Sequence, residues 1–486
     1  MKMKKKKMPY INKETCAGCS VCVENCPMDC LSIEEPKFHG DIHTIACVDE
    51  TKCIGCGICA KACPIQAIDM RDGGKAVYTV KNKLNVKKIY CRGFQSVMKI
   101  GMAILPWKVP KTLRGLDAVK RLPEAIKHKK FKKVLIVTDK MLMELHLLDG
   151  MLEAMDQQGL EYAIYDGVAP NPTDINVEEG VKLYKEEKCD CMIAFGGGSP
   201  MDCAKGIGAR ITRPHKSVKR LQGLFKILLP IPTIFAVPTT AGTGSETTVA
   251  AVITEAATHH KASMNDLCLM PKYAVLDPAL TVGLPPQVTA TTGMDALCHA
   301  VESYTNNTYN SKLEKDMCKK AVKLIYDNLY DVYQDGSNLK GRYNMQKAAF
   351  LAGRAFTRGC VGYVHAIGHT LGGLYGTPHG LAMSILLPHV LRAFGPAAYD
   401  KLADLCDVCG IKAADDTKKA KAEAFIDWIE DMKDKMNIPV YPEMIQEEDV
   451  EQIVAWAEKE GNPLYPTPVT WNKKDFKEFI LSLIGE

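Results

Sequence analysis

Two cysteine-rich segments near the start of the chain constrain its fold more than any other feature. Residues 16–27 read CAGCSVCVENCP and residues 53–64 read CIGCGICAKACP, so both follow the pattern C-x2-C-x2-C-x3-C-P. In this spacing, three neighbouring thiolates bind three irons of one cubane, and the fourth cysteine, followed by proline, binds the other cluster. The pattern therefore predicts two [4Fe-4S] clusters in one small domain.

The spacing also predicts which cysteines share a cluster. Cluster I takes Cys16, Cys19, Cys22 and Cys63, and cluster II takes Cys53, Cys56, Cys59 and Cys26. The similar sequences after the motifs, LSIEE from Leu31 and AIDMR from Ala67, predict strands of an internally repeated fold. Residues 9–72 resemble the bacterial two-cluster ferredoxin family, which implies a small α+β domain and one-electron transfer at low potential. Cys30 and Cys47 lie outside the pattern and are interpreted as packing residues, with a redox role as the alternative.

Composition limits the remaining possibilities. The 486 residues are enough for about three domains. The 20 cysteines occur without an apolar stretch after the N-terminal lysines, which favours reduced thiols, metal ligation and a cytoplasmic location over secretion and disulfides. No uncharged apolar run is long enough to span a membrane. The cysteine content further suggests an anaerobic or low-oxygen setting.

Charge is distributed unevenly along the chain. The net charge of +5 equals the charge of the five lysines among residues 2–7, whereas residues 75–133 contain seventeen Lys or Arg against Asp117 and Glu124. This basic stretch is interpreted as a solvated face or as a docking surface for an acidic partner, which could be the chain's own N-terminal domain. Nucleic-acid binding is not expected, because no recognition motif accompanies the charge.

A hinge and a short helix are expected next. Residues 73–88 have the composition of a hinge that breaks at residues 73–74, and residues 94–107 have an apolar stripe with about eleven residues of helical pattern. That stripe is too short for a membrane span and is expected to cover a seam between domains. A further helix is expected across residues 116–129.

An α/β domain is predicted from the alternation of apolar runs with helical patterns, which favours a mainly parallel sheet. The expected strands are 134–139, 161–166, 191–197, 234–240, 249–254 and 273–278. The glycine-rich sequence at 196–208 leaves one strand and enters a helix, where backbone NH groups can bind a pyrophosphate. Asp139 ends the first strand and can accept hydrogen bonds from a ribose diol while repelling a 2′-phosphate. With the small-residue loop 238–246, these features favour NAD over NADP.

Strand patterns nearly vanish after residue 283, and helical patterns replace them. The segment 365–380 contains three of the chain's 12 histidines, His365, His369 and His379. His365 and His369 are four residues apart, as are Asp295 and His299 upstream, so each pair projects from one face of a helix. Two such helices can converge on one metal ion, and the spacing predicts a metal site facing the nucleotide domain across a cleft.

The sequences GGGSPMD, PTTAGTGSE, GMDALCHAVE and HAIGHTLGGLYGTPHG occur in this order, and residues 95–486 thereby resemble the iron-containing (group III) alcohol dehydrogenases. The resemblance implies a multidomain protein, with a dehydroquinate-synthase-like architecture of an α/β domain and an all-helical domain after the ferredoxin domain. The expected boundaries are 9–72 for the ferredoxin domain, 73–110 for a basic linker and covering helix, 111–282 for the NAD-binding domain and 283–486 for the metal-binding domain.

The resemblance also assigns roles to residues. Divalent-metal ligands are implied at Asp295, His299, His365 and His379, and proton transfer beside the metal at His369. Cofactor contacts are implied at Asp139, Asn171, Gly197, Gly198, Ser199, Asp202, Thr239, Thr240 and, as a weaker match, Lys261. Three histidines and one carboxylate match the iron enzymes of the family, so the resemblance implies Fe²⁺, and Zn²⁺ is the fallback because ligand softness alone does not exclude it. The implied enzyme is an NAD-dependent alcohol dehydrogenase, and reduction of small aldehydes by NADH is the favoured direction.

The ferredoxin domain departs from ordinary members of that family. Hydride transfer moves two electrons together and each cluster passes one, and no flavin motif is evident between them. The clusters could re-reduce an oxidised metal, dock a redox partner protein or serve assembly. Alternative functions are a ferredoxin-linked aldehyde or alcohol oxidoreductase, or an electron-transfer protein that uses the dehydrogenase part as a scaffold. A homo-oligomer without nucleic-acid or membrane partners is expected.

Arg354 and Arg358 precede the histidine-rich segment and allow two interpretations. They could meet an anionic group of the substrate. Salt bridges within the helical domain are the favoured interpretation.

Overall fold

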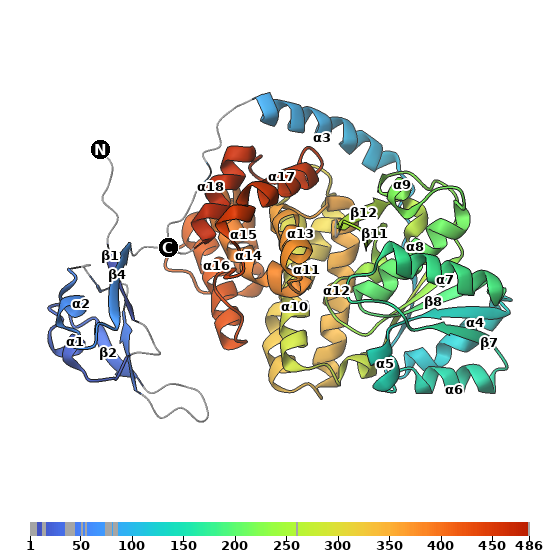
Figure 1. Ribbon diagram of the computed structural model, residues 1–486, viewed down its shortest axis with the longest axis horizontal. Helices are drawn as coiled ribbons and strands as arrows, with labels where there is room; N and C mark the ends of the chain where they lie inside the picture. Colours follow the sequence, from blue (N-terminus) through green and yellow to red (C-terminus); the bar gives the residue numbers. More distant parts are fainter. Residues whose placement is uncertain are drawn as a thin grey trace. The chain divides into compact units, whose positions relative to one another are not determined.

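A computed structural model describes residues 7–11, 16–34, 44–49, 52–53, 56–72, 80, 86–258 and 261–484 (Figure 1). The chain divides into two compact units, residues 1–78 and 79–486. Most of the expected hinge, including residues 73–74, lies outside the described residues. Its last three residues are helical, because helix α3 begins at Val86.

The first unit consists of two similar halves. Strand β1 pairs with β4 and strand β2 pairs with β3, both antiparallel, and one short helix belongs to each half. The elements are β1 Lys7–Ile11, α1 Val21–Glu24, β2 Leu31–Glu34, β3 Ile45–Val48, α2 Ile58–Ala62 and β4 Ile68–Asp72. Strands β2 and β4 are those predicted after the two cysteine motifs. Buried cysteines make up much of the small core beside Leu31, Ala46 and Ile68.

The second unit begins with a six-stranded parallel sheet in the order β5-β13-β10-β8-β6-β7. Its strands are β5 Lys111–Arg114, β6 Lys133–Val137, β7 Glu161–Tyr165, β8 Cys191–Gly196, β10 Thr233–Pro238 and β13 Tyr273–Leu276. Alternate residues of β6 enter two different cores: Leu135 packs on one face and Ile136 on the other. Both faces are therefore buried, as in a doubly wound sheet.

Helices cover both faces of this sheet, as Figure 1 shows. They are α4 Leu122–His128, α6 Asp149–Gln157, α7 Asp174–Glu186 and α8 Gly198–Thr212. Helix α4, together with the 3-10 turn Ala118–Arg121 before it, matches the helix predicted across residues 116–129. The parallel α/β architecture expected from the sequence is confirmed.

The structure adds two details that the sequence did not predict. The segment expected as a strand at 249–254 forms β11 Ala250–Thr254, which pairs antiparallel with β12 Lys261–Asn265 in a separate sheet that also contains β9 Gly223–Leu224. Its burial alternates along the strand, so it is not buried on both faces like β8. Conversely, the edge strand β5 was not predicted, because its sequence KTLR is mostly polar and partly exposed.

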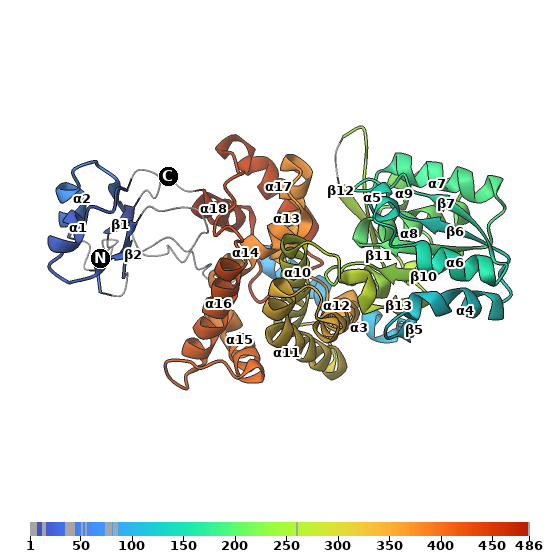
Figure 2. The same cartoon turned by 90° about the horizontal axis from the view of Figure 1, so that it is seen from below.

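The remainder of the second unit is helical, as predicted. Its helices are α10 Pro286–Thr305, α11 Lys312–Gln334, α12 Leu339–Gly359, α13 Tyr363–Tyr375, α14 His379–Phe394, α15 Pro396–Cys409, α16 Lys418–Lys435, α17 Val450–Gly461 and α18 Lys473–Leu483. Helix α10 lies among α11, α12 and α14 (Figure 2). All residues from 293 to 305 are buried, so polar side chains on this helix must find partners inside the protein.

Helix α3, Val86–Ile104, is longer than the eleven residues of helical pattern predicted for it. Polar side chains attach it to the C-terminal segment: Arg92 donates to the carbonyl of Thr467 at 2.6 Å, and Gln95 donates to that of Pro463 at 2.9 Å. Within the second unit the apolar stripe at 94–107 is mixed, since Val97 is 71% exposed and Ile104 77% exposed while Met102 is buried, and its role as a cover between domains stays a prediction. No helix among the described residues is long and apolar enough to cross a membrane.

Helix α12 approaches the loop before β11 so closely that a glycine is required. A Cβ atom on Gly353 would lie 2.7 Å from the carbonyl oxygen of Gly244 and would also overlap Thr247 Oγ1. We therefore expect Gly353→Ala to lower the free energy of unfolding by about 1–3 kcal/mol through overpacking. Urea unfolding followed by circular dichroism measures the change.

Gly101→Ala is the matched control, because Gly101 also lies inside a helix and a Cβ there meets nothing within 4 Å. This substitution should leave stability unchanged or raise it by about 0.5–1 kcal/mol. Equal losses in the two variants would contradict the close approach.

Candidate functional site

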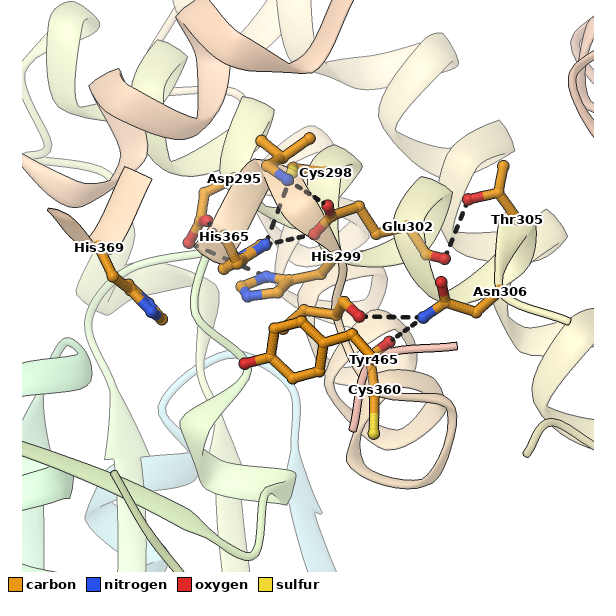
Figure 3. Close-up of polar contacts among 12 residues, drawn as sticks. Asp295, Cys298, His299, Glu302, Thr305, Asn306, Cys360, His365, His369 and Tyr465 are labelled. Atoms are coloured by element: carbon orange, nitrogen blue, oxygen red, sulfur yellow. Dashed lines mark hydrogen bonds and ion pairs between the residues drawn. The ribbon is translucent and has the colours of Figure 1, made fainter. Parts of the chain in front are cut away.

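Four side chains from three helices converge in the second unit. Asp295 and His299 come from α10, His365 comes from α13, and His379 is the first residue of α14. Each offers one ligand atom, and these atoms lie within 4.8 Å of one another. Asp295 Oδ1 is 3.4 Å from His379 Nε2 and 3.7 Å from His365 Nε2. Figure 3 shows how Asp295, His299 and His365 face one another.

The chemistry of these four groups fits a divalent metal ion. Asp295 Oδ1, His299 Nδ1 and His365 Nε2 are buried and have no hydrogen-bond partner among the described residues. Burial lowers the pKa of His299 to about 3 and that of His379 to about 4, so both imidazoles are neutral near pH 7, as ligation requires. Burial alone would raise the pKa of Asp295, but His299 and His379 hold it well below its usual range. The sequence-predicted ligand set is thus brought together around one point.

Glu302 orients one of these histidines. Its Oε2 lies 2.6 Å from His365 Nδ1, and its Oε1 accepts a hydrogen bond from the backbone NH of Val364 at 2.7 Å (Figure 3). With its Nδ1 proton donated to Glu302, His365 directs Nε2 toward Asp295. The sequence interpretation missed Glu302. The spacing of Asp295, His299 and Glu302, at i, i+4 and i+7 on one helix face, could have indicated it.

His369 lies beside the four-residue set and is not one of its members. Its ring centre is 5.2 Å from that of His379. Its Nδ1 is 2.7 Å from Glu460 Oε1, and Tyr465 donates its hydroxyl to the same oxygen at 3.0 Å. Burial opposes ionisation of Glu460, but His369 and these hydrogen bonds hold its pKa below the usual value. Glu460 and Tyr465 were not found from the sequence, because both lie about ninety residues further along the chain.

One cavity of about 710 Å³ connects the metal-ligand set with the α/β part of the same unit. His299, His365, His369 and His379 line it from the helical side. Five of the predicted cofactor contacts line it as well: Asn171, Gly198, Ser199, Asp202 and Lys261. A cleft between the α/β and helical parts, as predicted, is therefore present.

The other predicted cofactor residues lie at the carboxyl ends of adjacent strands. Gly197 follows β8, Thr239 and Thr240 follow β10, and Asp139 lies just beyond β6. The Thr239 NH donates to the carbonyl of Gly196 at 3.1 Å, which holds the two loops together. This edge of a parallel sheet is where such folds bind nucleotides. The Asp139 carboxylate accepts from the Leu142 NH at 3.0 Å and thereby also caps the following helix.

Asp202 is held by the protein itself. Its carboxylate accepts hydrogen bonds from Ser245 Oγ at 2.9 Å and from the Val252 NH at 3.0 Å. Lys205, one helical turn further along, is fully buried and donates to four oxygens of Ser245, Thr248 and Ala250. Burial lowers the pKa of Lys205 to about 8. The Lys205 network positions the cavity wall at residues 245–250 and was not predicted.

The two arginines before the histidine-rich helix lie outside this cavity lining. Arg358 Nη1 is 3.5 Å from Glu314 Oε1, which confirms the salt bridge within the helical domain that the sequence favoured. Burial lowers the pKa of Arg354, and the nearby Glu314 carboxylate opposes that change. The described contacts give neither arginine a role in substrate binding.

The cysteines of the first unit are also brought together. Cys26, Cys53, Cys56 and Cys59, the ligands predicted for cluster II, line a single cavity. For cluster I, Cys16 and Cys19 are close enough to raise the pKa of Cys22, which burial raises as well. Backbone NH groups of Ala46 and Ala67 lie 3.4 Å from Cys16 Sγ and 3.2 Å from Cys63 Sγ. Grouped thiols with NH donors fit iron–sulfur clusters.

Taken together, the fold and site define a metal-dependent oxidoreductase of α/β-plus-helical architecture. The family model "Iron-containing alcohol dehydrogenase" matches residues 110–278, and "Fe-containing alcohol dehydrogenase family, C-terminal" matches residues 289–484. The model "4Fe-4S dicluster domain" matches residues 15–67. The chain belongs to the iron-containing alcohol dehydrogenase family and carries a 4Fe-4S domain before it.

Characterised relatives agree with this family. The chain is 38% identical to 1,3-propanediol dehydrogenase of Citrobacter freundii over 368 residues, which are 75% of this chain and 94% of that one. It is 36% identical to the NAD-dependent methanol dehydrogenase of Bacillus methanolicus over 344 residues, 70% of this chain and 90% of that one. The crystal structure of a 1,3-propanediol oxidoreductase superposes with a TM-score of 0.75 at 36% identity, covering 78% of this chain and 100% of that one.

Glu302 gives a test of how the site holds metal. Glu302→Gln keeps the size of the side chain but removes its charge, so His365 loses the partner that sets its tautomer. We expect affinity for the mononuclear metal to fall about 10–100-fold. Because a [4Fe-4S] cluster contains equal iron and sulfide, this metal is measured as iron in excess of sulfide during titration with a chelator.

Glu314→Gln is the control, because Glu314 is another buried helical carboxylate but pairs with Arg358 outside the metal set. It should keep the wild-type metal affinity. Wild-type affinity in Glu302→Gln would show that the Glu302–His365 contact does not support the site.

Proposed function

We propose that this protein is an NAD(H)-dependent alcohol dehydrogenase and aldehyde reductase that uses one divalent iron ion, with an accessory domain carrying two [4Fe-4S] clusters. The observation that carries the proposal is the single cavity lined by three ligand histidines and by the start of helix α8. A nucleotide bound over α8 and a metal held by the histidines would face each other across that cavity.

The α/β end of the cavity supports NAD binding. Helix α8 begins at Gly198, so its backbone NH groups and dipole are available to a pyrophosphate. Lys261 donates to Asn171 Oδ1 at 3.1 Å, and both residues line the cavity beside Ser199. The Asp139 carboxylate would accept ribose hydroxyls and repel a 2′-phosphate, which favours NAD over NADP. The NAD-dependent relative from Bacillus methanolicus agrees with this choice.

The helical end of the cavity supports metal-assisted chemistry. We assign Asp295, His299, His365 and His379 as ligands of Fe²⁺, with Zn²⁺ as the alternative. When bound, such an ion supplies a Lewis acid that polarises an alcohol or carbonyl oxygen. Asp295 supplies the negative charge that retains a divalent cation, and Glu302 holds the Nε2 of His365 in the ligating direction. NADH, when bound, supplies the hydride.

His369 is assigned to proton transfer. It lines the cavity, and Glu460 accepts from its Nδ1, which leaves Nε2 to exchange a proton with the substrate or with water. Tyr465 holds Glu460 from the other side. The same arrangement serves both directions, since an imidazole nitrogen can accept a proton in one direction and donate it in the other. Reduction of an aldehyde consumes one proton, which His369 delivers.

The cavity wall near the metal favours a small substrate. Phe356, Val361 and Leu464 contribute apolar surface beside His299 and His365. We propose short alcohols and aldehydes as the substrate class. The relatives named for propanediol and methanol act on molecules of this size.

The first unit is proposed to carry electrons one at a time. Its eight motif cysteines would hold two clusters, which could re-reduce an oxidised catalytic metal or receive a redox partner protein. We also propose a homo-oligomeric enzyme. The intact set of four metal ligands argues against a dehydrogenase part that serves only as a scaffold.

The catalytic assignment is tested with anaerobically purified full-length protein. Wild-type protein should reduce a short aldehyde with NADH, more slowly with NADPH, and should contain about one iron per chain in excess of sulfide. His365→Ala should lose that iron and at least 100-fold in kcat/KM, because both the ligand and its contact with Glu302 disappear. His215→Ala, which removes an exposed histidine, is the control. Activity that survives His365→Ala would refute the metal assignment.

The role of the first unit is tested by oxidation and recovery. Protein briefly exposed to air is treated with reduced ferredoxin in excess of its oxidised metal centres, and the rates at which activity returns and the EPR signal of mononuclear Fe³⁺ declines are followed. If the domain re-reduces the metal, the signal should vanish and activity should return in the full-length protein. A variant lacking residues 1–72 should recover at least tenfold more slowly. Equal recovery in both proteins would exclude this role and leave docking or assembly.

A further inference from the structure

The cavity assigned to cluster II is lined by five cysteines, one more than a [4Fe-4S] cluster requires. Cys30 lines it together with the four expected ligands Cys26, Cys53, Cys56 and Cys59. Its Sγ lies 3.2 Å from Cys26 Sγ, and the residue is buried. Cys53 is the other cysteine that interacts with the Cys30 side chain. The fifth thiol thus lies between two of the four ligands.

The internal repeat of the domain shows that packing does not require a thiol at this position. Cys26 is followed by Pro27 and, four residues on, by Cys30; Cys63 is followed by Pro64 and, four residues on, by Ala67. In both halves the NH of the fourth residue approaches the ligand sulfur, at 3.4 Å from Cys30 and 3.2 Å from Ala67. Both turns are therefore built in the same way.

Backbone conformation and burial agree with this equivalence. The residue before the fourth position has a positive φ in each half, 48° at Asp29 and 54° at Gln66. Cys30 is 5% exposed and Ala67 is 3% exposed. The methyl group of Ala67 is enough to pack this position beside cluster I. The sulfur of Cys30 at the same position is therefore an addition specific to cluster II.

Iron–sulfur clusters are held by thiolates, and a thiolate that can reach the same iron is chemically equivalent to the one it replaces. Because Cys26 Sγ and Cys30 Sγ are already in contact, a rotation of the Cys30 side chain would place its sulfur where that of Cys26 had been. In the described part of the other half, the position that matches Cys30 beside Cys63 is occupied by Ala67 and offers no thiol.

We propose that Cys30 is a reserve ligand of cluster II that takes the iron of Cys26 when Cys26 is lost or released. This inference rests on the proposed cluster complement. The exchange breaks the iron–sulfur bond to Cys26 and forms one to Cys30, and a proton passes from Cys30 to Cys26. The cluster keeps its charge and no electron is transferred. Cluster II would therefore tolerate the loss of its proline-linked ligand, and cluster I would not.

The test measures iron and sulfide per chain, and the EPR spectrum of the reduced clusters, in anaerobically purified full-length variants. Cys26→Ala should keep wild-type cluster iron and sulfide, with an altered EPR spectrum for one cluster. The double variant Cys26→Ala with Cys30→Ala should lose at least one iron per chain. Cys30→Ala alone should keep both clusters, because Cys26 is the resident ligand.

The other half of the domain provides the matched control. Cys63→Ala should lose at least one iron per chain, as the Cys26/Cys30 double variant does. Adding Ala67→Cys to Cys63→Ala should restore the wild-type content, because it supplies cluster I with the reserve position. Failure of this restoration would overturn the inference that the position suffices for ligation.

Two results separate this inference from the proposed cluster complement. Wild-type protein with only one cluster would overturn both the two-cluster assignment and the reserve ligand. Wild-type protein with two clusters, but with the same loss in Cys26→Ala as in the Cys26/Cys30 double variant, would overturn the reserve ligand alone.

Discussion

A buried carboxylate, Asp295, is the group on which the catalytic half of the molecule depends. It lies on a helix that is buried on all sides, and a second carboxylate, Glu302, lies two turns further along the same helix. Two negative charges at this depth are costly unless positive charge compensates them. The imidazoles of His299 and His379 are neutral at pH 7. Burial opposes a charge on His365 as well, but Cys298 and Glu302 raise the pKa of His365 well above its usual range. A proton on His365 thus offsets part of the negative charge, and a divalent cation bound by the four side chains would take its place. The packing of α11, α12 and α14 around α10 thus buries the carboxylates, which raises the free energy of their charged forms, and brings the metal-ligand side chains together.

The position of that site relative to the parallel sheet determines what it can react with. The segments that follow the carboxyl ends of β7, β8 and β10 contribute residues to the cavity that the histidines line. Lys205 ties the loop at residues 245–250 to helix α8, and Gly353 lets α12 approach the same loop. These contacts hold the α/β and helical parts on opposite sides of the cavity of about 710 Å³ that both of them line. The cavity between the α/β and helical parts is therefore consistent with membership of the iron-containing alcohol dehydrogenase family.

The first unit obeys a different constraint. It is too small for a large apolar core, and the cysteines form much of its interior. Cluster ligation would then stabilise the fold and carry electrons with the same atoms. The two halves are nearly equivalent, but Cys30 and Ala67 break the equivalence beside the ligand sulfurs of Cys26 and Cys63. This difference would give cluster II an additional thiol beside its ligand sulfur, while the backbone turn is the same in both halves.

Short-range spacing carried most of what the sequence determined. Local patterns can be recognised from residue spacing alone. They include the two cysteine motifs, the i, i+4 pairs Asp295/His299 and His365/His369, and the apolar runs of the sheet. The resemblance to the family, and not the residue spacing, assigned His379 as a metal ligand and His369 as its proton-transferring neighbour. Strand β11 was predicted as a strand, but its place in a separate sheet was not, because an apolar run alone does not say which sheet it joins.

Only the tertiary structure decided the contacts made across the chain. Glu460 and Tyr465 meet His369 from about ninety residues away, and no periodicity links them in the sequence. The same holds for helix α3, whose polar residues Arg92 and Gln95 attach it to the C-terminal segment. Packing of distant helices fixes these contacts, because side chains that share a cavity need not share a sequence pattern.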